Sequence, residues 1–336
     1  KIDKFTIRNL EILESSEGNK KFSILHYLDQ TKTPMGKRLL RRWVLRPLTD
    51  KKELRERFET ISKLIEKNNF KGLQNCLRKF TDMERITVRI RLRRGKSIDF
   101  MKLKQALENI SETKAFLSKL NSIYLDSLAV KIHDHVSLYS YLKTALIDDE
   151  SILKSENRVI RSGFDESLDE LLAMTKNSDA QIRQMEIEEK KETGNNNLKI
   201  KYNKIHGYFI EISRLKNLNV PLYFTRIQTL KSVDRFTTEK LKYLENEILS
   251  ASTKYEKRVK EIIEKIAVKV DEEFETLLNT SKNLAKLDVL TNLAERAVEF
   301  DWIKPVFSDE SLLDIKGGRH AVVEHLSKEP FVKNNL

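Results

Sequence analysis

The chain has 336 residues, of which 39% are hydrophobic and 34% charged, and its formal net charge is +12. It contains no apolar run of about 18 residues, which excludes an obvious membrane span. Its one cysteine, Cys76, excludes an internal disulfide and suits a reducing cytoplasm. The excess of Lys and Arg favours a polyanionic partner, because basic side chains that contact phosphates release counterions; charge that serves solubility alone is the alternative. The chain begins with Lys1 rather than Met, so we expect a piece of a longer protein.

Helical patterns dominate residues 1–160, which we predict to form a helical core. Residues 23–28 indicate a short helix. Thr33 and Pro34 are typical of a helix start, as the N-cap and the first helical position, and Arg46-Pro47 ends that helix. Further helices of this part are expected at 50–65, 82–94 and 99–120.

Two groups of side chains in this core could either bind a ligand or have a purely structural role. His133 and His135 form an H-x-H pair without further ligands at metal-site spacing, so we predict no metal site. A basic cluster lies around Gly95. It could contact nucleic acid, but such clusters more often face solvent or pair with acids; its members are Arg89, Arg91, Arg93, Arg94 and Lys96.

Two long helical patterns follow. The first covers residues 161–193 and turns polar all round toward its end, which is typical of a helix that projects into solvent. The second runs without interruption over 238–299, and its apolar positions recur every eleven residues, as at Ile248, Val259 and Val270. This period keeps one face on a nearly straight helix, and only a partner helix can cover such a stripe. We therefore predict that the two helices pack antiparallel.

Residues 194–237, between the two long helices, are the one long stretch with strand chemistry. Apolar and polar side chains alternate over 198–202, 208–213 and 224–231, which is the period of a half-buried strand. Residues 198–237 hold eight basic and two acidic side chains. We predict a small basic sheet inserted between the helices.

The last segment, residues 300–336, indicates short strands at 302–307 and 312–315. No G-x-x-x-x-G-K-[ST] motif occurs in the sequence, so nothing in it is expected to cradle nucleotide phosphates. Paired acids such as Glu188-Glu189 lie on a charged helix without a pocket. We predict no catalytic residues, no metal ligands and no enzymatic activity for this chain.

Several motifs in the same order resemble the MutS family of DNA mismatch repair proteins, over essentially the whole chain. These motifs are TPMGKRLLRRWVLRPL at 33–48, FTDMERITVRI at 80–90, LKIKYNKIHGYFIEIS at 198–213, LDVLTNLAERA at 287–297 and GGRHAVVE at 317–324. The last departs from the family pattern, because Ala321 stands where the family usually has Pro.

The resemblance implies a mainly α fold, in which a helical core carries a long antiparallel helical lever and a small inserted β clamp domain. The implied domains are a helical core at 1–160, a first lever helix at 161–193, a β-rich DNA clamp at 194–237, a second lever helix returning to the core at 238–299, and the start of a truncated ATPase domain at 300–336.

In the family, the clamp holds the duplex backbone without reading its sequence. The resemblance places Thr229, Lys231 and Ser232 on a clamp loop that approaches phosphates, where Lys supplies charge and Ser a neutral hydrogen bond. The further candidates for DNA binding lie near the other tip or on the strands, and they are Arg214, Lys216, Asn217, Arg226, Gln228, Lys201 and Lys204.

The function implied is that of a non-catalytic part of a mismatch repair protein, whose clamp binds double-stranded DNA and whose lever links it to an ATPase outside this chain. ATP and Mg²⁺ are expected for the full-length protein only, which we also expect to be a homodimer with a MutL-type partner, without membrane contact. The alternative is a coiled-coil scaffold whose basic β insertion binds an acidic protein.

Overall fold

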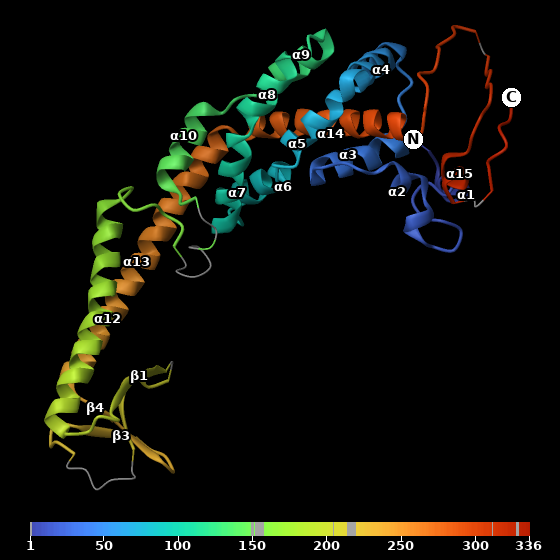
Figure 1. Cartoon of the computed structure of the whole chain (residues 1–336). Helices are drawn as coiled ribbons and strands as arrows, with labels where there is room; N and C mark the ends of the chain where they lie inside the picture. The colour runs from blue at the N-terminus through green and yellow to red at the C-terminus, as the bar shows by residue number, and fades with distance from the viewer. Residues whose placement is uncertain are drawn as a thin grey trace. The chain divides into compact units, whose positions relative to one another are not determined.

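The computed structural model describes residues 2–148, 151, 158–203, 205–213, 220–310, 312–326 and 329–336. It divides into two compact units, shown in Figure 1: a core unit, Lys1–Val159 with Ala267–Leu336, and an inserted unit, Ile160–Ile266. The described chain is mostly helical, and a four-stranded antiparallel sheet lies in the inserted unit. The prediction of a mainly α fold with a small β insertion is therefore confirmed.

The core unit is built around helix α14 (Phe274–Glu299), which runs beside the N-terminal helices in Figure 1. The helices packed against it are α2 (Ile24–Leu28), α3 (Pro34–Leu45), α4 (Lys51–Ile65), α5 (Asn69–Leu77), α6 (Met83–Arg91) and α9 (Ile123–Lys131). The other helices of this unit are α1 (Lys4–Asn9), α7 (Ser97–Glu108), α8 (Ile110–Ser118), α10 (Val136–Ala145) and α15 (Ala321–Leu326). Because α14 is buried on several sides, it forms the centre of this unit.

The start of α3 is held by a buried carboxylate on α14. Thr33 caps the helix by accepting a hydrogen bond from Gly36 N at 2.9 Å, and Pro34 takes the first position, as predicted. Asp288 Oδ2 accepts hydrogen bonds from Thr33 N and Thr33 Oγ1, both at 2.7 Å, and Oδ1 accepts one from Lys32 N at 2.9 Å. Gly36 faces the same carboxylate so closely that a Cβ at this position would overlap it. Residues 33–36 therefore suit the Asp288 carboxylate: Thr33 donates hydrogen bonds to it, and Gly36 leaves the space that it occupies.

A second junction ties α3 to the start of α6. Arg38 donates to Asp82 Oδ2 through Nη1 at 2.6 Å and to Glu84 Oε2 through Nη2 at 2.6 Å. Asp82 also caps α6, because its Oδ1 accepts a hydrogen bond from Arg85 N at 3.2 Å. Burial alone would raise the pKa of Asp82, but the hydrogen bonds from Arg38 and Arg85 hold it below its ordinary value. The acids of this motif thus have structural roles.

Two helices predicted as continuous are interrupted. The 99–120 prediction is divided into α7 and α8 at Asn109, and the 238–299 prediction into α13 (Glu239–Glu272) and α14 at Glu273. At both positions the backbone N–H bonds a carbonyl three residues back, which tightens the chain by part of a turn. At Glu273 the side chain is also engaged outside its helix, with Nδ1 of His135 at 2.5 Å.

The strands predicted at 302–307 and 312–315 are wrong, because the structure has no strand at either place. Ile303 and Val306 are almost fully exposed, and Pro305 between them has no N–H to pair. Pairing near the end of the chain consists of an isolated bridge between Gly318 and Asn334 and backbone hydrogen bonds between Ile315 and Leu336. Apolar residues alone therefore indicated strands where no neighbouring strand pairs with them.

The inserted unit consists of a helix pair with the sheet at one end of it (Figure 1). Helix α12 (Glu166–Thr193) lies beside α13 in opposite direction, since Arg258 pairs with Asp165 at 2.7 Å and Lys240 with Glu188 at 2.9 Å. The predicted apolar stripe of α13 is inward: Leu241, Ile248 and Ile266 are buried. The antiparallel packing predicted from the eleven-residue repeat is thus seen within this unit.

The sheet has the order β1-β2-β4-β3, all antiparallel. Its strands are β1 (Lys199–Asn203), β2 (Gly207–Ser213), β3 (Thr225–Thr229) and β4 (Val233–Thr237). The first three match predicted strands, whereas β4 lacks a clear alternation in VDRFT. One face packs on the helix pair through a hydrophobic cluster whose members are Ile182, Met185, Leu198, Ile210, Ile212, Phe224, Phe236, Leu241 and Ile248.

Candidate nucleic-acid interface

The two faces of the sheet have different chemistry. Ile210 and Ile212 of β2 point into the hydrophobic cluster with α12 and α13. Phe209 and Glu211 lie on the opposite, outer face, because side chains alternate along a strand. Residues paired across strands share a face, so Lys201, which is opposite Phe209, also belongs to the outer face. The basic residues predicted to bind DNA can therefore be sorted by face.

Glu211 is the centre of a charge network on the outer face. Its carboxylate accepts hydrogen bonds from Lys201 Nζ at 2.6 Å and from Arg235 Nε at 3.4 Å. Arg235 also donates to Gln228 Oε1 at 2.7 Å and lies over the Phe209 ring, 4.4 Å from its centroid. The hydrogen bond from Lys201 holds the pKa of Glu211 below its ordinary value, against the opposing effect of burial. The carboxylate thus stays ionised and offsets part of the positive charge of this face.

The hairpin turn between β3 and β4 exposes three of the predicted side chains. Thr229 pairs with Asp234, and Leu230 N donates to Val233 O at 2.9 Å, which leaves Lys231 and Ser232 as the two residues at the tip. Thr229, Lys231 and Ser232 are exposed, and their side chains make no hydrogen bond or ion pair with the described residues. An amino group and two hydroxyl groups at one turn are suited to phosphate oxygens.

Arg226 lies on the edge strand β3, on the face of Phe236. Its guanidinium pairs with Asp234 at 3.6 Å and sits over the Phe236 ring, 5.4 Å from the centroid. The register shifts between Arg226 and Gln228, which places these two predicted residues on different faces of the sheet. Arg226 is 57% exposed at its side chain, so it remains within reach of a ligand at the sheet edge.

The structure brings some predicted residues together and separates others. Thr229, Lys231 and Ser232 share the turn, and Ser213 at the end of β2 pairs with Val233 directly after it. Lys201 and Gln228 belong to the outer-face network. The remaining candidates lie outside the described residues, and they are Lys204, Arg214, Lys216 and Asn217.

Sequence reasoning missed the residues that organise the outer face, namely Phe209, Glu211 and Arg235. Each could have been found from the strand register, because Glu211 is opposite Lys199 on one side and Arg235 on the other. The pairing of β2 with β4 could not be inferred, because β4 itself was not predicted. The available signal was Glu211, an acidic residue in a stretch that is otherwise basic.

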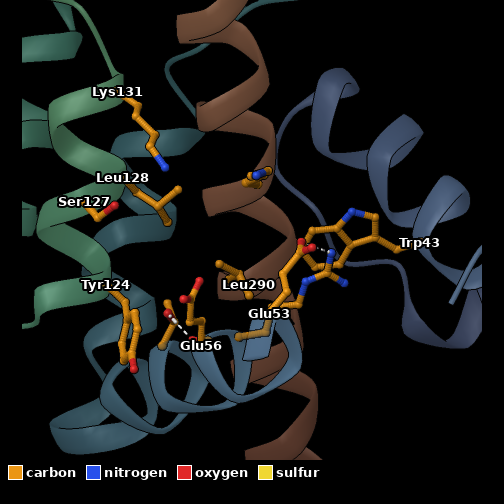
Figure 2. Close-up of a pocket in the computed structure, with 11 residues that line it drawn as sticks. Trp43, Glu53, Glu56, Tyr124, Ser127, Leu128, Lys131 and Leu290 are labelled. Atoms are coloured by element: carbon orange, nitrogen blue, oxygen red, sulfur yellow. Dashed lines mark hydrogen bonds and ion pairs between the residues drawn. The ribbon is translucent and has the colours of Figure 1, made fainter. Parts of the chain in front are cut away.

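The core unit contains a hollow that has to be considered as a second candidate site. Figure 2 shows Trp43 of α3, Glu53 of α4, Lys131 of α9 and Leu290 of α14 around it. The guanidinium of Arg57 lies 3.4 Å from the Trp43 ring centroid and donates to Glu53 at 3.0 Å. The cavity measures about 100 Å³, whereas ligand pockets usually measure roughly 300–1,000 Å³. It is too small for a nucleotide, and two of its charged groups, Arg57 and Glu53, bond each other.

Of the histidine pair of the core, His135 is buried and part of the packing, whereas His133 is exposed. Nδ1 of His135 faces Glu273 at 2.5 Å and Nε2 faces Thr280 Oγ1 at 3.0 Å, so both ring nitrogens have partners. Within the described ranges, no three His, Cys, Asp or Glu side chains come together as metal ligands do. The helices of the same ranges include none with the length and apolar character needed to cross a bilayer.

The comparison with protein families identifies the family of the chain. The model of MutS domain III matches residues 5–294, which covers most of the core unit and the entire inserted unit. The chain belongs to the MutS family. As a MutS-family chain it is related to mismatch repair proteins, and the part that it matches is a core domain distinct from the ATPase of the MutS family. The expectation that residues 300–336 begin an ATPase domain falls beyond the matched residues and stays a prediction.

Proposed function

We propose that this chain is a non-catalytic, DNA-holding part of a mismatch repair protein, in which the β3–β4 turn contacts the phosphate backbone of duplex DNA. The supporting observation is the exposed Thr229, Lys231 and Ser232 at one turn, without partners among the described residues. Contacts of this kind go to phosphate and carry no sequence information.

The basic residues of the outer face add positive charge that favours DNA binding. Lys201 and Arg235 are both held by Glu211, and of the two basic side chains Lys201 is the more exposed, at 49% against 21%. Pairs with such an exposed side chain are weak, on the order of 0–1 kcal/mol, so a phosphate that approaches the face can replace the carboxylate as the partner of Lys201. Gln228 and Arg226 would follow as weaker contacts.

We further propose that α12 and α13 form the lever that links this DNA contact to an ATPase elsewhere in a longer protein. A long helix pair is a suitable carrier of such coupling. The sequence holds no G-x-x-x-x-G-K-[ST] motif, so ATP and Mg²⁺ belong to the full-length protein in this proposal, as do a homodimer, a MutL-type partner and a cytoplasmic location.

The test is duplex binding by Lys231→Glu, measured by fluorescence anisotropy at several salt concentrations. We expect a loss of affinity on the order of fivefold to tenfold and a decrease of about 1 in the slope of log K against log salt, as for one lost phosphate contact. Lys257→Glu is the matched control, since Lys257 is exposed on α13 and makes the same charge change.

Equal losses in the two variants would show an effect of net charge alone and would reject the turn as a DNA contact. Binding that is retained by Lys231→Glu and does not depend on duplex length would favour the alternative, in which the basic sheet binds an acidic protein.

A further inference from the structure

A row of arginines lies along one side of α3 in the core unit. Arg38, Arg41 and Arg42 are three and four residues apart, and Arg46 follows at the end of the helix, so they share one side. Together with Leu45 they line a groove, which we call the arginine groove. Arg41, Arg42 and Arg46 are exposed, and none pairs with an acid among the described residues.

The positive surface continues from α3 onto α1. Arg41 also lines an adjoining hollow with Lys4 and Arg8 of α1 and with Lys20, and the one acid in its lining is Glu14. A backbone hydrogen bond from Ile2 N to Leu45 O at 3.3 Å joins the chain before α1 to the end of α3. Basic side chains of both elements therefore line the same hollow.

Several other basic residues of the core unit are paired with acids of the same chain. In the cluster around Gly95, Arg89 pairs with Asp99 at 2.5 Å, and Arg91 with Asp271 at 3.6 Å and Glu275 at 3.8 Å. On α3 itself, Arg38 is held by the two acids at the start of α6. The three remaining arginines of the groove have no such role in holding the fold together.

We propose that the arginine groove binds the phosphate backbone of duplex DNA. The row from Arg38 to Arg46 covers about 12 Å at ~1.5 Å per residue, and duplex DNA presents about one charge per ~1.7 Å of its axis. Guanidinium groups on a rigid helix match such a fixed ladder of phosphates. This surface lies in the core unit and is independent of the sheet.

The lining of the groove favours a duplex over the other polyanions. Single strands are usually held by stacking on aromatic side chains, and neither hollow is lined by an aromatic residue. A protein partner would be favoured by an apolar centre that is poor in charge, whereas basic side chains outnumber the apolar ones, Ile7, Leu13 and Leu45, in the two linings.

The test compares the 336-residue chain with a variant carrying Arg41→Glu, Arg42→Glu and Arg46→Glu, in anisotropy titrations with a labelled duplex of random sequence. We expect affinity to fall on the order of tenfold or more, and the slope of log K against log salt to decrease by about 2 to 3, as for three lost phosphate contacts. The corresponding Arg→Gln variant should change both quantities in the same direction by less, and circular dichroism melting checks that each variant is folded.

The matched control reverses three exposed lysines of the same unit outside the groove, and these are Lys71, Lys119 and Lys282. Loss of DNA affinity in the groove variants, with little change in this control, supports the proposal. Equal losses in groove and control variants, or no loss in the groove variants, would overturn it. Lys231→Glu is titrated in parallel, so that a failure of the sheet contact is distinguished from a failure of the groove.

Two further titrations test the choice of ligand. Affinity for a single strand of equal length that matches that for the duplex would overturn the duplex assignment. Binding of polyglutamate as tight as that of DNA, and lost equally in the groove variant, would show a surface for acidic proteins and would also overturn the proposal.

Discussion

Gly36 shows how one missing side chain permits a buried contact. The carboxylate of Asp288 fills the space where a Cβ would stand, and it binds Thr33 at the same time. Burial raises the pKa of Asp288, while hydrogen bonds from Lys32 and Thr33 oppose that rise. The contact therefore depends on close and complete hydrogen bonding rather than on charge alone.

We expect Gly36→Ala to destabilise the chain by about 1–3 kcal/mol, because the methyl group overpacks the site and displaces a hydrogen-bonded carboxylate. In an exposed helix interior the same change would stabilise by ~1 kcal/mol. Denaturant unfolding measures the difference. Its matched control is a double-mutant cycle with Asp288→Ala, in which Gly36→Ala should cost less, because the overlap with the carboxylate is removed and only the close approach to the Cβ of residue 288 remains. A neutral or stabilising Gly36→Ala in the unaltered background would contradict the overlap.

Single residues also mark how far the sequence could be read. Thr33, Pro34 and Asp50 predicted helix starts correctly, because caps act locally and need no knowledge of the fold. Glu211 could not be assigned from local pattern, since its role depends on which strands lie on either side. Site residues that act through cross-strand partners were the ones missed.

At the scale of elements, the break between α13 and α14 is held by a buried histidine. His135 is neutral in this setting: burial lowers its pKa and outweighs the hydrogen bond and charge of Glu273, which would raise it. Nδ1–H then donates to Glu273, and Nε2 accepts from Thr280 Oγ1. The other charged or titratable neighbours that affect the ring are His133 and Asp134.

A lowered histidine pKa makes stability depend on pH in a known direction. His135 is protonated near pH 6.5 in the unfolded chain, whereas in the folded chain it binds a proton only at lower pH. The free energy of unfolding therefore decreases as the pH falls below about 6.5. The loss approaches but does not exceed ~1.4 kcal/mol per pH unit for one group. Urea unfolding from pH 7.5 to 5.5 should show a steeper decline for the unaltered chain than for His135→Gln. Identical declines would mean that His135 titrates normally in the fold.

Elements with a regular period of apolar residues were predictable, and segments without one were not. The stripe of α13 repeats over many turns, so the sequence shows its inward face clearly. The short strand β4 does not alternate, and residues 302–307 are mostly apolar but do not pair as a strand. Pairing partners decide whether such segments become strands, and these partners lie far away in the chain.

At the scale of the whole molecule, the two units differ in the amount of buried apolar surface. The core unit surrounds α14 with helices on several sides, whereas the described residues of the inserted unit bury apolar side chains between two helices and on one face of a small sheet. Regions with few buried apolar contacts open at lower free energy. The inserted unit should therefore be the less stable of the two.

Native-state hydrogen exchange tests this difference. We expect amides of β1–β4 to exchange at lower opening free energies than those of α14. Ile210→Ala should lower the protection of the sheet, at a cost of about 2–5 kcal/mol for a buried side chain, and leave that of α14 unchanged. The control, Leu287→Ala in α14, should act on the core unit. Loss of protection in both units from Ile210→Ala would show that they open together.

The hydrogen bonds of Asp288 have a consequence for the order in which the chain folds. They join residues 255 and 256 positions apart, so the start of α3 lacks its partner until almost the whole domain has left the ribosome. The cluster of the inserted unit, from Ile182 to Ile248, is complete earlier in synthesis. A chain made at roughly 5–20 residues per second therefore has seconds in which the sheet can form while α3 still waits. Helix α14, which is made later, thus completes the start of α3, and the inserted unit can fold before the core unit is complete.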